Sequence, residues 1–339
     1  MSKVSVLTAV YNDEKHLRKC LDSLLNQTLE DIQIICIDDC STDSTPDILQ
    51  EYASRDSRIT VIRQEENQGQ AIARNAGLEI ADGKYITMLD SDDWFAPDSL
   101  EKAYTALEKN KDCDCAVFRL MMCYPQSSEE DLKIEEYPNQ TSAKKLKGKD
   151  AFFLSLDFSL HGLYMVRSEI HKTYPYDTSC RLYSDDNTSR LHYLHSRNVI
   201  LCDGEYYYLK HSESMTNKAS VLRFDLMFAN LNMKRLLEEE RHEGMLGNRK
   251  ESEKILDFYE THRWLMVVDS YYYYYQHKKE FKKSERRLIK DKFREIIKTI
   301  ESHRLSTHLR IKLGYVPFKR WWLFKTQEQI YFKLKSWVS

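Results

Sequence analysis

Short apolar runs alternate with amphipathic segments along the first 112 residues. The apolar runs have the length of buried strands, and they are Val4–Ala9, Ile32–Ile37, Ile59–Ile62 and Tyr85–Leu89. The segments between them repeat apolar residues at helical spacing and predict helices at Glu14–Asn26, from Pro46 onward, at Gln70–Ala81 and at Pro97–Lys109. This alternation predicts an α/β fold, in which a mostly parallel sheet is flanked by helices on both faces.

The pattern is less regular from residue 113 to residue 216. Strands are predicted at Ala116–Met122 and Leu163–Val166, and helices at Asp150–Leu156 and Ser184–His195. The polar stretch Pro125–Lys149 shows neither pattern, so we expect an excursion from the sheet there.

Two more apolar runs, Val199–Cys202 and Tyr206–Leu209, flank the pair Asp203-Gly204. An Asp-Gly pair between apolar runs is typical of a tight turn, so a β-hairpin is predicted here. From Leu222 onward the pattern is helical and rich in Lys and Arg.

Composition places the chain among globular proteins. It has 339 residues, of which 42% are hydrophobic and 31% charged, and its formal net charge is −2. This balance excludes a uniformly basic nucleic-acid binder. No run approaches the roughly 18 apolar residues that a membrane-spanning helix needs. The eight cysteines contain no CxxC pair, so reduced thiols of a cytoplasmic protein are expected rather than a zinc site.

The near-zero net charge conceals a strong asymmetry. Residues 278–339 carry 18 Lys and Arg against 6 Asp and Glu, a net of +12, which leaves residues 1–277 with 33 against 47, a net of −14. Aromatic residues are interleaved with the basic ones near the end, as at Trp321, Trp322 and Trp337. This pattern predicts peripheral association with an anionic membrane surface. The alternatives are a helical cap whose aromatics pack on the catalytic domain, or a surface that pairs two protomers.

Acidic residues follow two of the predicted strands. Asp38-Asp39 ends the second strand, and Asp90, Asp92 and Asp93 follow the fourth. Ligands of such sheets bind beyond the carboxyl ends of the strands. Carboxylates gathered there repel one another unless a cation neutralises them, and oxygen ligands suit Mg²⁺ or Mn²⁺. The sequence therefore predicts a divalent-cation site at this edge of the sheet.

At these positions the sequence resembles the family 2 inverting glycosyltransferases, which have the GT-A fold with a Rossmann-like sheet. The resemblance runs through blocks in the family's order and spacing, and these are Val4–Asn12, Leu24–Thr28, Ile37–Asp43, Asn67–Gly69, Ala73–Gly77, Asp82–Ile86 and Leu89–Trp94. It is specific over about residues 3–110 and looser in the middle region. His161-Gly162-Leu163-Tyr164 departs from the tryptophan and lysine that many relatives carry there.

The resemblance assigns a nucleotide site to the first half. Thr8, Ala9 and Tyr11 are expected to line the nucleobase pocket. Asp39 is expected to accept a hydrogen bond from the N3–H of the base, which suits uracil. Arg74 is expected near the nucleotide, where it balances Asp39 or a phosphate.

The resemblance also assigns the metal site. Asp92 is the expected direct ligand, and Asp90 is expected to hold the ribose or the water shell of the metal. Ser91 lies between them and is grouped with the nucleotide-binding residues. His211 follows a predicted strand and is expected to add a metal ligand or to contact the diphosphate.

Inverting transfer needs a general base, which the family places as the second acid of a Glu-Asp pair that opens a helix. Here Asp185-Asp186 stands in that place, so Asp186 is the predicted base, and Asp185 replaces the longer glutamate. The helix N-terminus favours an ionised Asp186, whereas the charge of Asp185 opposes ionisation. The alternative role for the pair is stabilisation of the helix terminus.

The resemblance implies a metal-dependent transferase that moves a sugar from a nucleoside diphosphate, with UDP favoured, to a glycan or lipid-linked acceptor. It divides the chain into a nucleotide-sugar-binding half at 1–112, an acceptor-binding half at 113–216 and a helical extension at 217–339. The expected location is cytoplasmic and peripheral on the inner face of the plasma membrane. A catalytically inactive nucleotide-sugar-binding module and a nucleotidyltransferase are the alternatives, and a phosphoacceptor signalling domain does not account for Asp185-Asp186.

Overall fold

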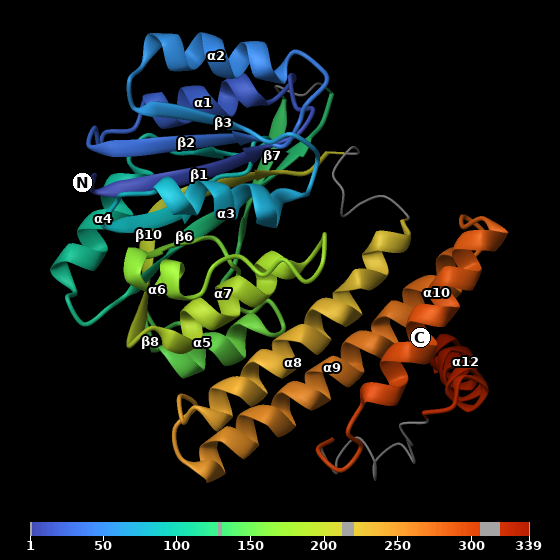
Figure 1. Cartoon of the computed structure of the whole chain (residues 1–339). Coiled ribbons are helices and arrows are strands. Elements are labelled where there is room, and N and C mark those ends of the chain that lie inside the picture. The colour runs from blue at the N-terminus through green and yellow to red at the C-terminus, as the bar shows by residue number, and fades with distance from the viewer. Residues whose placement is uncertain (1, 128–130, 212–219, 306–318, 339) are drawn as a thin grey trace. The chain divides into compact units, whose positions relative to one another are not determined.

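A computed structural model describes residues 2–127, 131–211, 220–305 and 319–338 (Figure 1). The chain divides into two compact units. The first comprises Met1–Arg181 and Asp185–Ser214, and the second comprises Leu182–Ser184 and Met215–Ser339.

One ten-stranded sheet organises the described part of the first unit. Its strand order is β3-β2-β1-β4-β9-β6-β10-β5, with β7 beside β6 and β8 beside β10. The strands are β1 (Val4–Val10), β2 (Ile32–Asp38), β3 (Ile59–Arg63), β4 (Tyr85–Met88), β5 (Trp94–Phe95), β6 (Cys115–Pro125), β7 (Leu132–Tyr137), β8 (Lys145–Lys147), β9 (Tyr164–Arg167) and β10 (Asn198–Leu209).

Helices cover both faces of this sheet. They are α1 (Leu17–Leu25), α2 (Thr45–Arg55), α3 (Gln70–Ile80), α4 (Ser99–Lys109), α5 (Gly148–Ser155), α6 (Ser168–Thr173) and α7 (Ser184–His195). Apolar residues of α1, α2 and α4 share one core with alternate residues of β1 and β2, whereas α3 packs on the residues of the opposite face (Figure 1). The α/β fold with helices on both faces is confirmed.

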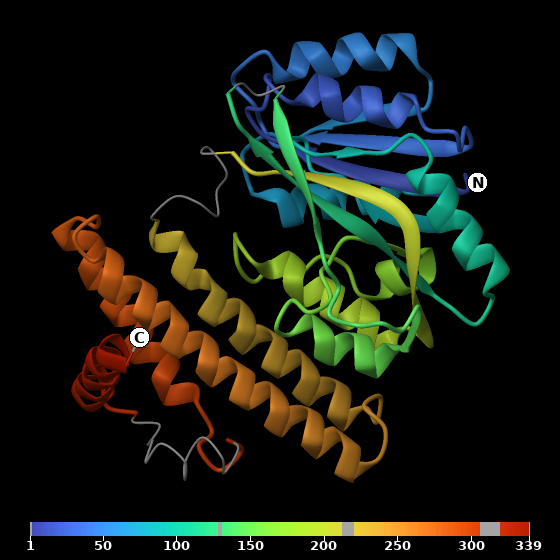
Figure 2. The same ribbon diagram turned by 180° about the vertical axis from the view of Figure 1, so that it is seen from behind.

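The two halves of the sheet differ in strand direction. Strands β1 to β4 are parallel, as the alternation with helices predicted. Beyond them β9 runs antiparallel to both β4 and β6, whereas β10 is parallel to β6. Figure 2 shows the long strands β6, in green, and β10, in yellow, from behind. Because β4 and β10 both lead toward the same edge, residues after each strand meet there.

The predicted hairpin at Asp203-Gly204 is wrong, because β10 continues as one strand through this pair. Its register against β6 shifts between Leu201 and Glu205, which marks a β-bulge. The Ser99 hydroxyl fills the bulge, accepting from the Glu205 N–H at 2.9 Å and donating to the Glu205 carbonyl oxygen at 2.8 Å. A Cβ at Gly204 would lie 2.6 Å from the Ser99 carbonyl oxygen. The glycine therefore permits close approach of α4 rather than a turn.

The stretch Pro125–Lys149 is not merely an excursion, since it contributes β7 and β8 to the sheet. Strand β7 pairs antiparallel with the end of β6, and four of its six residues are exposed. A paired strand with so little burial lacks the apolar alternation by which strands are predicted. Cross-strand charges contribute instead, because Arg119 donates to both carboxylate oxygens of Glu136 at 2.8 and 2.9 Å.

The second unit is helical in its described residues. Its elements are η1 (Val221–Asp225), α8 (Leu226–His242), α9 (Arg249–His277), α10 (Lys283–Ile296), η2 (Ile297–Thr299) and α12 (Trp321–Val338). Phe324 and Phe332 of α12 are buried in a core with Trp264, Tyr271 and residues of α10. These two aromatic rings of the basic tail therefore pack in the hydrophobic core of this unit. No described helix is both long and apolar enough to cross a membrane.

Candidate active site

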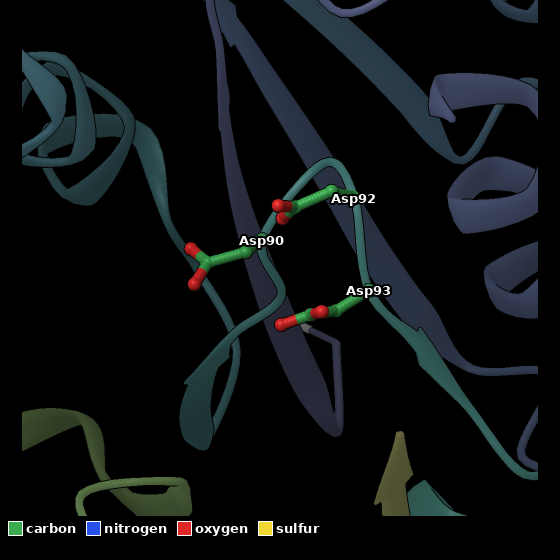
Figure 3. A group of neighbouring side chains, drawn as sticks. All are labelled: Asp90, Asp92 and Asp93. Carbon is green, nitrogen blue, oxygen red and sulfur yellow. The ribbon is translucent and has the colours of Figure 1, made fainter. Parts of the chain in front are cut away.

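Three carboxylates gather on the loop that follows β4. Asp90, Asp92 and Asp93 each present an oxygen within 4.8 Å of the others, and all three side chains extend from this one loop (Figure 3). Within the described residues this is the only such group of His, Cys, Asp or Glu side chains. The predicted acidic cluster at this edge of the sheet therefore forms.

Asp93 has a structural role in this cluster. It is 1% exposed, and its two oxygens accept hydrogen bonds from the Leu209 N–H and the Tyr206 hydroxyl, both at 2.8 Å. Burial, together with the charges of Asp92 and Asp90, raises its pKa well above the ordinary value. Asp93 thus ties the loop to β10, which explains why Asp90 and Asp92 are the better candidates for metal ligands.

Asp92 contacts the predicted histidine. Nε2 of His211 lies 2.9 Å from Oδ2 of Asp92, across 119 positions of sequence, because β10 delivers His211 beside the β4 loop. The carboxylates of Asp92 and Asp90, and the imidazole of His211 beside Asp92, are oxygen and nitrogen donors of the kind that fit Mn²⁺ or Mg²⁺. These three residues would hold the ion.

Asp90 forms an ion pair with Arg74, which is 1% exposed on α3. Burial raises the pKa of Asp90, and Arg74 opposes that shift. The negative charges of Asp92 and Asp185 add to the increase in the Asp90 pKa, so both carboxylates lie close to Asp90. Arg74 was expected to balance Asp39 or a phosphate, and in the structure its carboxylate partner is Asp90.

Only one of the three nitrogen atoms of the Arg74 guanidinium forms hydrogen bonds with described residues. Its Nη2 also donates to Gln70 at 3.2 Å, and its carbon Cζ lies 5.4 Å from the ring centre of Tyr176. Its Nε and Nη1 are buried and find no hydrogen-bond partner among the described residues. The Tyr176 ring beside Arg74 is positioned by Asn75, whose side chain forms two hydrogen bonds of 2.9 Å with the Tyr176 backbone.

Sequence reasoning missed a second set of polar residues beside the metal ligands. Asp13 and His16 precede α1, and they form a 2.6 Å contact between Oδ1 of Asp13 and Nδ1 of His16. The other oxygen of Asp13 accepts from the Ser91 hydroxyl at 2.6 Å, and the His16 ring lies 4.9 Å from that of His211. The signal in the sequence was only their place shortly after β1, at the edge where ligands bind.

Asp39 holds a neighbouring loop. It is 3% exposed, and its oxygens accept from the backbone N–H groups of Gln68 at 2.9 Å and Gly69 at 2.7 Å. Gly69 has a φ of +94°, a conformation that favours glycine. The Asp39 carboxylate, just after β2, thus fixes the backbone that leads into α3.

The residues predicted to line the nucleobase pocket differ in exposure. Thr8 is fully buried in β1, and its hydroxyl has no partner among the described residues. Its side chain therefore presents no surface to a ligand. Ala9 is half-buried, and Tyr11 is 50% exposed just beyond the end of the strand.

The predicted base lies in the first turn of α7. Burial is the main reason that the pKa of Asp186 is raised to about 7, where Asp185 adds to the shift and Arg190 opposes it. A carboxylate with this pKa can accept a proton near neutral pH. The charge of Asp185 also acts on Arg74 and Asp90, so the start of α7 lies near the ion pair beside the metal ligands.

Comparison with known proteins decides the family. The profile described as Glycosyl transferase family 2 matches residues 5–171. The glycosyltransferase GlyG of Streptococcus pneumoniae serotype 4 is 30% identical over 234 residues, which cover 67% of this chain and 75% of GlyG. The chain belongs to glycosyl transferase family 2.

Two further comparisons describe its neighbours. The poly(ribitol-phosphate) beta-glucosyltransferase of Bacillus spizizenii is 43% identical over 112 residues, which cover 32% of this family 2 chain and 18% of that enzyme. The structure of S. aureus TarS 1–349 in complex with UDP-GlcNAc matches with a TM-score of 0.74 at 18% identity, covering 98% of this chain and 92% of TarS 1–349. This likeness shows the fold, and the predicted GT-A fold is confirmed. The chain spans less than two thirds of the length of several other curated relatives that it matches, from 14% to 59%.

Proposed function

We propose that this family 2 chain transfers a sugar from a UDP-sugar to a hydroxyl of a polysaccharide or lipid-linked acceptor, with inversion and with a divalent cation. The observation that carries the proposal is the convergence of two acidic sites. The charge of Asp185, the neighbour of the proposed base, acts on Asp90 and Arg74, which supports a base within electrostatic reach of the proposed metal loop. A transferase needs this arrangement, whereas a module that only binds nucleotide sugars does not.

In this proposal Asp186 removes the proton from the acceptor hydroxyl. The hydroxyl oxygen attacks the anomeric carbon of the donor while the bond to the nucleoside diphosphate breaks on the opposite face. The raised pKa of Asp186, about 7, suits a base that must take a proton near neutral pH. Asp185 supports this role by raising that pKa.

The metal-side residues act on the diphosphate. Asp92, His211 and Asp90 would hold Mg²⁺ or Mn²⁺, which supplies positive charge for the leaving diphosphate. Arg74 contributes a fixed positive charge beside Asp90, which favours a negatively charged diphosphate nearby. Ser91 is held by Asp13 and supports the loop.

The nucleobase would lie against Ala9 and Tyr11, which present surface after β1. Asp39 retains acceptor capacity beyond its two backbone bonds, because each carboxylate oxygen offers two lone pairs. An N3–H donor of uracil suits that acceptor. The UDP-GlcNAc complex of TarS supports a UDP-sugar as donor.

The acceptor is proposed from the relatives. The name of the poly(ribitol-phosphate) enzyme describes transfer of glucose to a polymer, and we infer an acceptor of similar size, a glycan chain or a lipid-linked precursor. Membrane association through residues 278–339 now rests on their net charge of +12, because Phe324 and Phe332 are buried in the helical unit. Cytoplasmic location and pairing of protomers stay predictions.

Calorimetric titration of UDP into the full chain tests the site. With Mn²⁺ present, UDP is expected to bind, and omission of Mn²⁺ or the Asp92→Ala substitution should weaken binding at least tenfold. Asp31→Asn is the matched control, because Asp31 is exposed and its side chain forms no bond with a described residue. Equal affinity with and without Mn²⁺ in the parent chain contradicts the metal site. A thermal-shift panel of nucleotide sugars then identifies the donor.

A further inference from the structure

A cavity of about 200 Å³ lies within the helical unit and is lined by residues of α9, α10 and α12 and by Lys278. Two kinds of side chain line it. The aromatic ones are Tyr271, Tyr274, Tyr275 and Trp321, and the polar ones are Lys278, Arg286, Lys290, Lys325 and Gln329. Four of these nine residues are cationic and none is acidic. No catalytic or metal-site residue discussed above belongs to this set.

The four cations lack counter-charges in the structure. Lys278, Arg286, Lys290 and Lys325 form no ion pair with any residue that the structure describes, although other basic residues nearby do, such as Lys292 with Asp225. Lys278 instead lies 5.0 Å from the ring centre of Tyr275. Like charges around a small concave space repel one another, so the arrangement favours an anion inside it.

Arg286 is oriented for such a ligand. Its Nε donates to the Phe281 carbonyl oxygen at 2.8 Å, which fixes the guanidinium and leaves both terminal nitrogens available. Its positive charge opposes the increase that burial causes in the pKa of Tyr274, so it lies near that phenol. Lys290 lies one turn further along α10, and both side chains are half-buried.

Glu328 is an acid whose charge acts on a residue of the cavity wall. Glu328 precedes Gln329 on α12 and contributes, after burial, to the raised pKa of Tyr271, about 12. It is fully buried and does not line the cavity. The cavity surface therefore keeps its positive charge.

The aromatic residues of the cavity indicate which kind of molecule the anionic group belongs to. Tyr271 and Tyr274 are buried, and the Tyr274 hydroxyl forms no hydrogen bond with a described residue, so it is available to a ligand. Aromatic faces pack against the C–H faces of sugars and polyols, while Arg and Lys bind phosphate oxygens. We propose that this cavity binds a phosphate group carried on a polyol or sugar.

Isothermal titration of the full chain at low ionic strength, without divalent cation, tests the proposal. The probes are sn-glycerol 3-phosphate, inorganic phosphate and glycerol. Glycerol phosphate is expected to bind more tightly than inorganic phosphate, and glycerol is expected not to bind. The double variant Lys290→Gln/Lys325→Gln changes side chains that form no hydrogen bond or ion pair with a described residue, and it should weaken the binding of glycerol phosphate at least tenfold.

The matched control is Lys283→Gln/Arg287→Gln. It removes the same charge from exposed positions of α10 that do not line the cavity, and it should leave affinity within twofold of the parent. Three results overturn the proposal: no saturable binding of glycerol phosphate, equal loss in both variants, or inorganic phosphate binding as tightly as glycerol phosphate. Binding to phosphatidylglycerol vesicles without binding of soluble glycerol phosphate also overturns it and assigns the charge to a lipid surface.

Discussion

Two neighbouring aspartates on the β4 loop differ in what surrounds their carboxylates. Asp93 is buried and accepts from the Leu209 N–H and the Tyr206 hydroxyl, whereas Asp92 is 29% exposed and faces His211. Asp93→Ala leaves those two buried donors unpaired, so the free energy of unfolding should fall by about 1–3 kcal/mol. Asp92→Ala should lower it by much less while abolishing metal-dependent UDP binding. Urea unfolding of both variants checks the contrast, and equal destabilisation would contradict these roles.

The raised pKa of Asp186 predicts a pH dependence of transfer. The base acts when ionised, so kcat/KM should rise with pH and reach half its plateau near pH 7. Asp185 raises the pKa of Asp186, and Asp185→Asn should therefore move the rising limb to lower pH. Rate measurements between pH 5 and 9 on both proteins provide the test. If the pH profile of Asp185→Asn stays in place or moves to higher pH, the charge of Asp185 does not raise the pKa of Asp186.

Residue chemistry in the sequence predicted the site only in part. Asp90 and Asp92 lie on one loop and His211 contacts Asp92, because β4 and β10 end at one edge. The partner of Arg74, the burial of Thr8 and the contact of Asp13 with His16 depend on side-chain packing across distant segments. No spacing along the chain encodes them.

At the scale of elements, the bulge in β10 shows why an Asp-Gly pair misled the prediction. The pair is typical of a turn, but at Gly204 the approach of α4 decides the conformation, through the Ser99 hydroxyl and carbonyl. The strands β1 to β4 were predictable because burial on both faces leaves continuous apolar runs. β7 was not, since it is paired yet mostly exposed.

Gly204→Ala tests this account of the bulge. The new Cβ would meet the Ser99 carbonyl oxygen at 2.6 Å, and backbone has little room to move, so unfolding should become easier by about 1–3 kcal/mol. Gly77→Ala is the matched comparison, because its Cβ would meet the end of the Ile37 side chain at 2.7 Å, which can shift. A larger cost at Gly77 than at Gly204 in urea unfolding would contradict the assignment.

At the scale of the molecule, a group of buried histidines links stability to pH. Burial lowers the pKa of His161, His192 and His195 to about 4 and that of His171 further. The unfolded chain binds protons at these residues below pH 6.5, whereas the folded chain does not until about pH 4. Stability should therefore fall as pH drops from 6.5 to 4, by about 1.4 kcal/mol per pH unit for each histidine.

His171→Leu isolates one member of this group. His171 is 2% exposed, and neither ring nitrogen has a partner among the described residues. The substitution should reduce the slope of unfolding free energy against pH by about one proton between pH 6 and 4.5. Urea unfolding at several pH values measures the slope, and an unchanged slope would show that His171 does not titrate on unfolding.

The whole chain also separates its charges, with −14 over residues 1–277 and +12 over the basic remainder. The sequence predicted this polarity but not how the tail uses its aromatic rings, since a helical pattern does not distinguish a membrane face from a core. The structure buries Phe324 and Phe332 and leaves cations around a cavity. Phosphate recognition by that cavity is therefore a more specific expectation than general attraction to a membrane.

The most direct test of the proposed mechanism compares the parent chain with the Asp186→Asn variant. The rate of UDP release from the preferred UDP-sugar is measured for both proteins in the presence of Mn²⁺ and acceptor. The substitution keeps the shape of the side chain and removes its ability to take a proton. We predict that the rate falls by about a hundredfold or more while the affinity for UDP is unchanged. UDP release at the parent rate by Asp186→Asn would contradict the proposed base and, with it, the proposed mechanism of transfer.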